Sequence, residues 1–399
     1  MPTESHGHIR RSLIRLGEEE PTMLRLADAW TWDFWLADDG QKYHLFFLKA
    51  PKSLGDPDQR HFHASVGHAV SLDLCNWDLL PDAIVPGGRS SFDDIAVWTG
   101  SVVNGLDGRW YMYYTGITTE ESGLVQRIGL ATSEDLIHWE KNSGFAVLSA
   151  DCRWYEKLGE GSWGHEAWRD PWVFKDPSGN GWHMFVTARS RCGAEDSRGV
   201  IGHLVSEDLL NWEVKAPVTK PESGFGVMEV MQVEEIDGQA VLLFSCQEPE
   251  LGVAKRENHG RGGIWVAKGG SLLGGFELAN AQLLSDDSLY SGRVVRNRLG
   301  NWVMLAFRNK DANGEFVGEI TDPIPLAWKE DGMCALVGSG RHLTVAVTSA
   351  SPVLQVRDSE LGVMHRAGVH WLSTYLRMMS RCASPQDAAK YEGNHRWFR

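Results

Sequence analysis

The sequence predicts an all-β fold, a five-bladed β-propeller followed by a short C-terminal extension. Three observations support this prediction: a turn motif that occurs three times, an aromatic-rich strand that occurs five times, and no helical periodicity between them. The strands recur with a period of roughly 65 residues, which suits a blade of four antiparallel strands with its connections. Solenoid repeats are shorter, and a β-sandwich does not repeat so regularly.

The turn motif has the form Ser-x-Asp-Leu-x-x-Trp. Ser and Asp favour a turn because their side chains bond to nearby backbone amides, and we expect the Leu and the Trp to anchor the turn against the core. The three copies occupy residues 71–77, 133–139 and 206–212. They are in phase with the aromatic-rich strands, as expected if the same turn recurs in successive blades.

The aromatic-rich strands follow turn residues. Most of them come directly after a short segment that contains Gly, Asn or Asp, which is typical of a β-hairpin. We therefore expect each of these strands to pair with a strand just upstream. The five strands begin at Tyr43, Trp110, Trp182, Ala240 and Trp302.

The repeat divides the chain into three parts. Residues 1–27 are expected to form an N-terminal arm, and residues 28–339 the propeller. Residues 340–399 are expected to hold a ring-closing strand at 342–347, a short helix at 371–379 and a tail. This extension is too short to form a full second β-sandwich domain.

The composition limits the partners of the protein. With a formal net charge of −14, the chain of 399 residues would be repelled by nucleic acid and by anionic membranes, so we expect neither as a partner. The N-terminus has no apolar signal segment and no stretch approaches the length of a membrane helix. The sequence therefore predicts a cytoplasmic protein, or a secreted one if a signal peptide has been removed. It carries no signal for an oligomeric state.

Acidic residues occupy equivalent points of the repeat. Propeller blades place their innermost strands around the axis, so residues at the same point of each repeat converge at one end of the channel. About 10 to 12 residues before the aromatic-rich strands, three of the five positions are acids in apolar segments: Asp33, Asp170 and Glu229. Trp98 and Tyr290 hold the other two positions. Buried carboxylates cost free energy, so three that face one axis imply function or a tight ion-pair cluster.

Glycoside cleavage requires two carboxyl groups, one as nucleophile or base and the other as an acid with a raised pKa. We expect a sugar pocket around these acids, formed by side chains that flank them or share their phase. Because side chains alternate along a strand, Trp35 is expected on the same side as Asp33, and Trp32 on the opposite side unless the strand is strongly twisted. The candidate sugar-binding residues are Trp32, Trp35, Trp98, Ser101, Arg169 and Tyr290.

These motifs resemble those of the five-bladed propellers of glycoside hydrolase families 32 and 68, the invertases, fructanases and levansucrases. The resemblance implies that Asp33 is the nucleophile, Asp170 the transition-state stabiliser and Glu229 the general acid/base of a retaining β-fructofuranosidase. It also implies a neutral oligosaccharide or sucrose-like substrate, with fructosyl transfer as a further outcome. The residues that carry the resemblance are Trp32-Asp33, Trp98-Thr99-Gly100-Ser101, Arg169-Asp170-Pro171 and Met228-Glu229-Val230.

The chain departs from these families at two places. Invertases carry Asn-Asp-Pro-Asn-Gly around the nucleophile, where this chain has Trp-Asp-Phe-Trp, and a Gln where it has Leu48. Two alternatives therefore stay open: an inverting furanosidase similar to the arabinan-cleaving propellers of family 43, and a sugar-binding propeller without catalysis. The spacing of His61, His63 and His68 could suit a metal, but no Cys or repeated acid completes such a site. We expect no metal and no cofactor.

Overall fold

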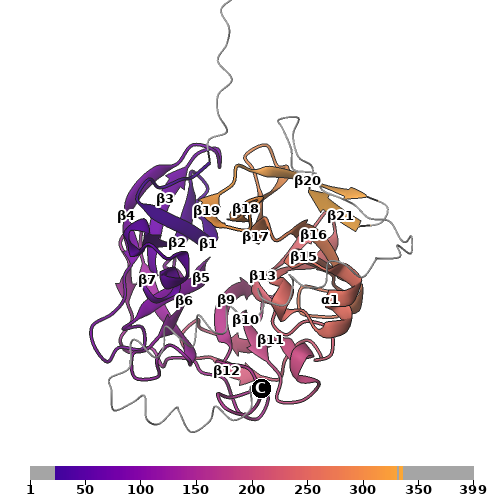
Figure 1. Cartoon of the computed structure of the whole chain (residues 1–399). Helices are drawn as coiled ribbons and strands as arrows, with labels where there is room; N and C mark the ends of the chain where they lie inside the picture. Colours follow the sequence, from indigo (N-terminus) through magenta and orange to yellow (C-terminus); the bar gives the residue numbers. More distant parts are fainter. Residues whose placement is uncertain (1–22, 330–331, 336–399) are drawn as a thin grey trace, which may run out of the picture.

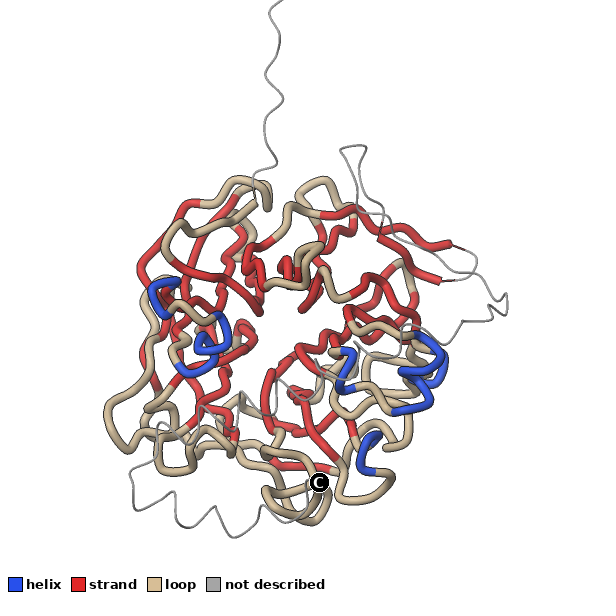
Figure 2. Tube along the Cα trace, in the orientation of Figure 1, coloured by secondary structure: helices blue, strands red, loops and turns tan. Residues whose placement is uncertain are grey.

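The computed structural model describes residues 23–329 and 332–335. Their strands form five antiparallel sheets around a central axis, which confirms the predicted five-bladed β-propeller (Figure 1). In each sheet the first strand lies nearest the axis and later strands lie toward the rim. Figure 2 shows that strands dominate the described chain, with short helical segments in the connections.

The first four blades have four strands each, and the fifth has five. Blades 1 and 2 contain β1 (Ala29–Asp38), β2 (Tyr43–Pro51), β3 (Ser65–Ser71), β4 (Asp78–Ile84), β5 (Ala96–Asn104), β6 (Trp110–Ile117), β7 (Gln126–Ser133) and β8 (Glu140–Lys141). Blades 3 and 4 contain β9 (Trp168–Lys175), β10 (Trp182–Arg189), β11 (Gly199–Ser206), β12 (Glu213–Lys215), β13 (Glu229–Ile236), β14 (Gln239–Cys246), β15 (Gly263–Lys268) and β16 (Gln282–Asp286). Blade 5 contains β17 (Leu289–Arg296), β18 (Trp302–Lys310), β19 (Phe316–Ile320), β20 (Ile324–Lys329) and β21 (Gly332–Ala335). The helical segments are η1 (Lys52–Leu54), η2 (Pro57–Phe62), η3 (Glu195–Ser197), η4 (Glu248–Glu250), α1 (Val253–His259) and η5 (Leu278–Asn280).

The three turn motifs connect the third and fourth strands of blades 1, 2 and 3. In the first copy, the backbone N–H of Leu74 donates to Ser71 Oγ at 2.8 Å. Leu74 has a left-handed backbone, with φ 68°, and its side chain is buried in the core. Leu136 and Leu209 repeat this conformation at φ 64°. Such a backbone costs a non-glycine residue about 1–2 kcal/mol, which the side-chain hydrogen bonds and the burial of the Leu offset.

The first two strands of each blade form the predicted hairpin. Gly40 in the β1–β2 turn has φ 87°, a left-handed value that glycine adopts without strain. The second strands carry much of the core, and β10 is buried along its whole length. Glycines occur at the same point of the other four hairpins, with φ between 81° and 86°: Gly108, Gly179, Gly238 and Gly300.

Every first hairpin also contains a register shift near the start of its innermost strand. We call the unpaired residues at these shifts the bulge ring. Three of its members, Asp170, Val230 and Ser291, have positive φ angles of 56°, 49° and 52°. A bulge bends its strand and re-aims the side chains next to it, and here all five bulges surround one axis. The bulge ring consists of Asp33, Thr99, Asp170-Pro171, Val230-Met231 and Ser291-Gly292.

The ring is closed by contacts between blade 1 and blade 5. Leu24 and Ile320 exchange two backbone hydrogen bonds of 3.1 Å. Thr31 Oγ1 donates to the carbonyl of Gly318 at 3.1 Å, across 287 residues of sequence. The predicted strand at 342–347 and helix at 371–379 lie outside the described residues, as do residues 1–22 of the predicted arm.

One of the histidines considered for a metal, His68, is buried inside blade 1. Its Nε2 lies 3.0 Å from His44 Nδ1, and His44 Nε2 lies 3.3 Å from a carboxylate oxygen of Asp39. Burial lowers the pKa of His68 to about 3, so the imidazole is neutral at physiological pH. Blade 3 repeats the arrangement with Asp176, His183 and His203.

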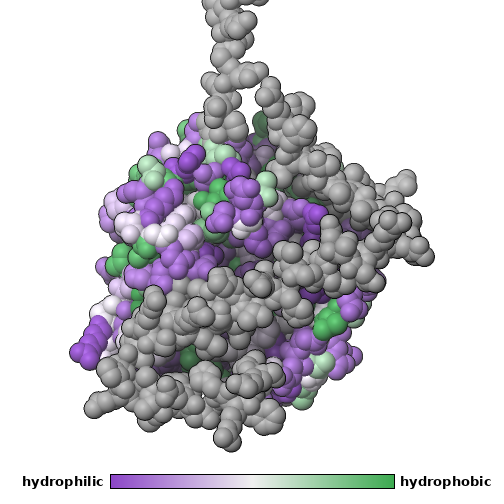
Figure 3. Space-filling model, viewed as in Figure 1, coloured by the Kyte–Doolittle hydropathy of each residue, from purple (hydrophilic) through white to green (hydrophobic). Residues whose placement is uncertain are grey.

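The visible face of the molecule is mainly hydrophilic where it is described, with hydrophobic residues in small separate groups (Figure 3). Within residues 23–329 and 332–335, no helix is long and apolar enough to span a membrane.

Candidate active site

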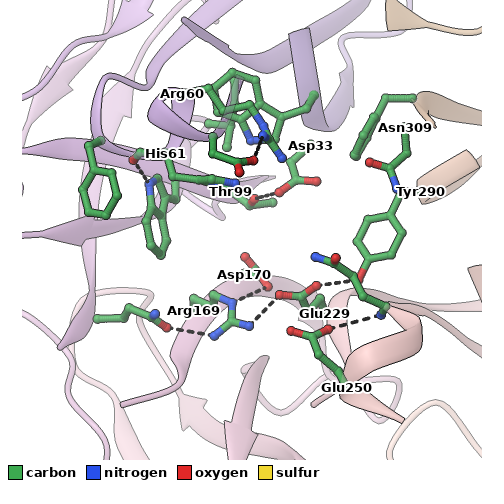
Figure 4. Close-up of a pocket in the computed structure, with 18 of the residues that line it drawn as sticks. Asp33, Arg60, His61, Thr99, Arg169, Asp170, Glu229, Glu250, Tyr290 and Asn309 are labelled. Carbon is green, nitrogen blue, oxygen red and sulfur yellow. Dashed lines mark hydrogen bonds and ion pairs between the residues drawn. The ribbon is translucent and has the colours of Figure 1, made fainter. Parts of the chain in front are cut away.

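A pocket lies among the five innermost strands, near their first residues. Asp33 from β1, Asp170 from β9 and Glu229 from β13 all line it, so the structure brings together the three acids that share a phase in the sequence. Figure 4 shows Asp33 facing Asp170 and Glu229 across the open space. The pocket has a volume of about 100 Å³.

Hydroxyl groups hold both carboxylate oxygens of Asp33. Thr99 Oγ1 donates to Oδ2 at 3.0 Å, and Ser291 Oγ donates to Oδ1. Burial, followed by the nearby carboxylate of Asp170, raises the pKa of Asp33 to about 7, although the hydrogen bond from Ser291 opposes this shift. The two donors fix the orientation of the carboxylate toward the pocket.

Asp170 is held from two neighbouring strands. Thr187 Oγ1 donates to its Oδ2 at 2.9 Å, and the backbone N–H of Val230 donates to the same oxygen at 3.2 Å. Burial raises the pKa of Asp170, while the guanidinium of Arg169 favours the charged form and opposes that rise. Asp170 therefore joins blade 3 to blade 4 at the pocket floor.

Glu229 has a different set of partners from Asp33. Arg169 Nη2 donates to its Oε1 at 2.5 Å, and the Tyr290 hydroxyl donates to its Oε2 at 2.5 Å. Arg169 Nε also lies 3.5 Å from Asp170 Oδ2, and Nη1 donates to Gln126 Oε1 at 3.0 Å. Burial disfavours the charge on Arg169, but Glu229 and Asp170 outweigh it and raise its pKa. Arg169 and Tyr290, both candidates from the sequence, thus orient this acid.

Trp32 and Trp98 form an aromatic wall of the pocket. The His61 ring lies between them, with ring centroids 6.1 Å from Trp32 and 6.2 Å from Trp98. Trp98 Nε1 donates to the backbone carbonyl of His61 at 2.7 Å, which fixes the indole. His63 is exposed and His68 is buried elsewhere in blade 1, so the three histidines do not gather. Among the described residues, no group of three or more His, Cys, Asp or Glu could hold a metal ion.

Two candidate residues do not line the pocket. Trp35 is fully buried in the core, stacked on Phe46 with ring centroids 6.1 Å apart. The expectation that Trp35 shares the side of Asp33 assumed regular alternation, but the bulge at Asp33 changes which side chains face the axis, and Trp32 reaches the pocket instead. Ser101 is also buried, and its Oγ accepts a hydrogen bond from the backbone N–H of Val173 at 3.0 Å.

The sequence argument missed several polar residues of the site. Thr99 and Ser291 donate hydrogen bonds to Asp33. Each directly follows a residue that the repeat had identified, Trp98 or Tyr290, so comparing the next position of each repeat would have found them. Most of the other residues come from connections that do not follow the repeat, whereas Gln126 lies on β7 and Asn309 on β18. Burial and the neighbouring Glu229 raise the pKa of one of them, Glu250, to about 8. The lining residues outside the repeat argument include Asp58, Arg60, His61, Gln126, His165, Gln247, Glu250 and Asn309.

The site places a carboxylate held by two hydroxyls opposite a carboxyl group held by an arginine and a tyrosine, with a third acid beside them. Glycoside cleavage uses two carboxyl groups in this way, with a nucleophile on one side of the scissile bond and a proton donor on the other. Leu48 also lines the pocket and presents an apolar side chain there.

The chain matches the family model described as the glycosyl hydrolases family 32 N-terminal domain over residues 36–270, more than half of its length. It is 30% identical over 194 residues to β-fructofuranosidase 1 of Zea mays, covering 47% of this chain and 26% of that protein. It is 32% identical over 178 residues to sucrose-6-phosphate hydrolase of Zymomonas mobilis, covering 43% and 30%. The chain thus spans less than a third of either relative. Asp170 and Glu229 lie inside the family match, and Asp33 lies just before it.

Solved structures share the fold. An inulosucrase from Halalkalicoccus jeotgali bound to kestose superposes with a TM-score of 0.63 at 21% identity, covering 82% of this chain and 92% of that one. A family 32 β-fructofuranosidase from Bombyx mori gives a TM-score of 0.60 at 19% identity, covering 80% and 65%. At such identities the likeness establishes the propeller architecture.

Proposed function

Because this chain belongs to glycosyl hydrolase family 32, we propose that it is a retaining glycosidase of β-fructofuranosides. The observation that carries the proposal is the pair Asp33 and Glu229, which face each other across the pocket with different hydrogen-bond partners. Hydroxyl donors hold Asp33 ready to attack, whereas an arginine and a tyrosine orient Glu229 on the other side. Retaining glycosidases use a pair of carboxyl groups in these two roles.

Two steps follow from this assignment. Asp33 attacks the anomeric carbon of the fructosyl unit while Glu229 gives a proton to the departing oxygen, which forms a fructosyl ester on Asp33. Glu229 then takes a proton from water, and the water oxygen attacks the same carbon and releases Asp33. Asp170 stabilises the positive charge that develops on the sugar ring in both transition states. When a sugar hydroxyl replaces water, the fructosyl unit is transferred.

The pocket supports a small neutral substrate. Aromatic side chains and hydrogen-bonding groups line it together, which suits the apolar faces and the hydroxyl groups of a sugar ring. Five acidic residues line it against two arginines, and even with the raised pKa values of Asp33 and Glu250 the lining has no excess of positive charge to bind a phosphate, which favours a neutral sugar over a phosphorylated one. We therefore propose sucrose or short fructo-oligosaccharides as substrates. The acidic lining residues are Asp33, Asp58, Asp170, Glu229 and Glu250.

The deciding experiment follows purified protein with sucrose by NMR and records which anomer of fructose appears first. Retention gives β-fructofuranose before mutarotation mixes the anomers. First appearance of the α-anomer would instead assign an inverting mechanism of the family 43 type. Saturable sugar binding without any turnover would assign a binding propeller. A parallel reaction with sucrose 6-phosphate should be slower, because the pocket is acidic.

The activity should fall as the pH drops below about 7. Asp33 must be ionised to attack, and burial in the folded protein raises its pKa to about 7. The test is a profile of kcat/KM between pH 5 and pH 9. Ser291→Ala removes a hydrogen bond that lowers this pKa, so its acid limb should move to higher pH. A wild-type limb centred near pH 4 would contradict this assignment.

Trp98→Ala should raise KM about tenfold, because the indole supplies apolar contact to the sugar. The melting temperature should stay within a few degrees, since Trp98 is only half-buried. Trp77→Ala, in the turn of blade 1, is the matched control and should lower the melting temperature without changing KM. If Trp98→Ala unfolds the protein and leaves the KM of the remaining activity unchanged, Trp98 is structural.

A further inference from the structure

Arg293 is a buried cation on β17, with only 2% of its surface exposed. Its Nε donates to the backbone carbonyl of Phe34 at 3.1 Å. Its Nη1 donates to the carbonyls of Val230 and Met231, at 3.1 and 2.5 Å. The guanidinium also lies over the Trp172 ring, 5.0 Å from its centroid. Arg293 therefore contacts the innermost strands of blades 1, 3 and 4 from blade 5.

The carbonyls that Arg293 binds are next to the proposed catalytic acids in sequence. Phe34 follows Asp33, and Val230 follows Glu229. Val230 is unpaired in the register shift of β13, and Phe34 borders the register shift of β1. At such shifts carbonyls leave the regular strand ladder and accept hydrogen bonds from other donors. A planar guanidinium with several N–H groups in fixed directions can satisfy carbonyls from two strands at once.

The strand that carries Arg293 also contacts both acids through other side chains. Ser291 donates to Asp33, and Tyr290 donates to Glu229. These two residues precede Arg293 on β17. One short segment of blade 5 thus contacts both acids in two ways. Its hydroxyl groups donate to the carboxyl oxygens, and its guanidinium donates to backbone carbonyls next to the acids in sequence.

We propose that Arg293 is a positioning residue, which fixes the placement of Asp33 relative to Glu229 and supplies a positive charge behind the carboxylates. The inference rests on the proposed function, because it concerns the same pair of acids. Arg293 touches neither the pocket nor the substrate directly: it is absent from the lining of the pocket and acts through the backbones of its neighbours.

The charges around Asp33 decide the sign of the expected effect. Asp170 and Glu229 disfavour its ionisation, while the guanidinium groups of Arg60 and Arg293 interact favourably with its carboxylate. Burial lowers the pKa of Arg293 to about 10, so it is charged at neutral pH. Removal of this charge should therefore raise the pKa of Asp33 and move the acid limb of activity to higher pH.

The test uses Arg293→Met and Arg293→Lys in the full chain. Arg293→Met removes the charge and the hydrogen bonds, and should lower kcat about a hundredfold, leave KM within about threefold and raise the acid limb by about one pH unit. Arg293→Lys keeps the charge but loses the planar group whose fixed N–H directions reach the carbonyls of both strands. It should lower kcat about tenfold with the acid limb unchanged. Arg296→Met is the control, because Arg296 lies on the same strand but is exposed.

The outcomes separate this inference from the proposed function. If wild-type protein turns over no fructoside, the proposed function fails first. If wild type is active and both Arg293 variants keep its kcat and pH profile, the positioning role is overturned. Should Arg293→Met fail to fold, Arg293→Lys decides alone: a kcat loss with unchanged KM, acid limb and melting temperature supports positioning. A loss of melting temperature without a change in kcat assigns a purely structural role.

Discussion

Asp33→Ala is expected to lower the turnover of sucrose at least about a thousandfold, because no covalent fructosyl ester can form without this carboxylate. The loss should appear in kcat, with KM changed little. Steady-state rates of the purified variant measure it. Retention of more than about a tenth of the wild-type rate would remove Asp33 from the mechanism.

A second measurement separates lost chemistry from a damaged fold. Burial in the folded protein disfavours the ionised form of Asp33 and raises its pKa from 3.8 to about 7. Between pH 3.8 and about 7, the folded protein keeps a proton on Asp33 that the unfolded chain has already released. The stability of the folded protein therefore falls as the pH rises through this range. Asp33→Asn should then melt at a higher temperature than wild type at pH 8, although it is inactive. A lower melting temperature would contradict this account of Asp33.

Glu229→Ala is expected to cost at least about a thousandfold on sucrose, because the departing sugar oxygen loses its proton donor. The loss should depend on the leaving group. A fructosyl fluoride needs little proton donation, so Glu229→Ala should still form the fructosyl ester from it. Added azide should then attack this ester and give a fructosyl azide of retained configuration.

The same substrate discriminates between the two acids. Asp33→Ala should stay inactive on the fluoride without azide, since it lacks the nucleophile rather than the proton donor. Azide that binds in the space left by the Asp33 side chain would attack the anomeric carbon directly and give a fructosyl azide of inverted configuration. If both variants respond identically to the fluoride, the two carboxyl groups do not have the separate roles assigned to them.

The sequence predicted the fold because the same local features recur along the chain, the hairpin glycine in all five blades and the turn motif in three of them. The left-handed Leu of each turn motif and the glycine of each first hairpin fix short-range geometry that does not depend on the rest of the chain. The five aromatic-rich strands then set the number of blades. The sequence did not predict ring closure through Leu24 and Ile320, because an isolated pair of backbone hydrogen bonds has no sequence pattern.

The acids of the site were predictable for the same reason, since Asp33, Asp170 and Glu229 occupy one phase of the repeat. The face of the strand on which the neighbouring side chains lie was not predictable. Simple alternation placed Trp35 in the pocket, whereas the bulge at Asp33 sends Trp32 there. Bulges depend on backbone pairing between strands, which a sequence pattern of period two does not represent.

The hydrogen bond that joins Thr31 to Gly318 has a consequence for biosynthesis. Closing a loop of 287 residues carries a length-dependent entropy cost of about 5 kcal/mol, and such distant contacts form late in folding. A nascent chain that ends before β17 already contains Asp33, Asp170 and Glu229. It still lacks Ser291 and Tyr290, which hold two of them. The chain would therefore stay inert on the ribosome until its final blade emerges, and the appearance of activity would report completion of the ring.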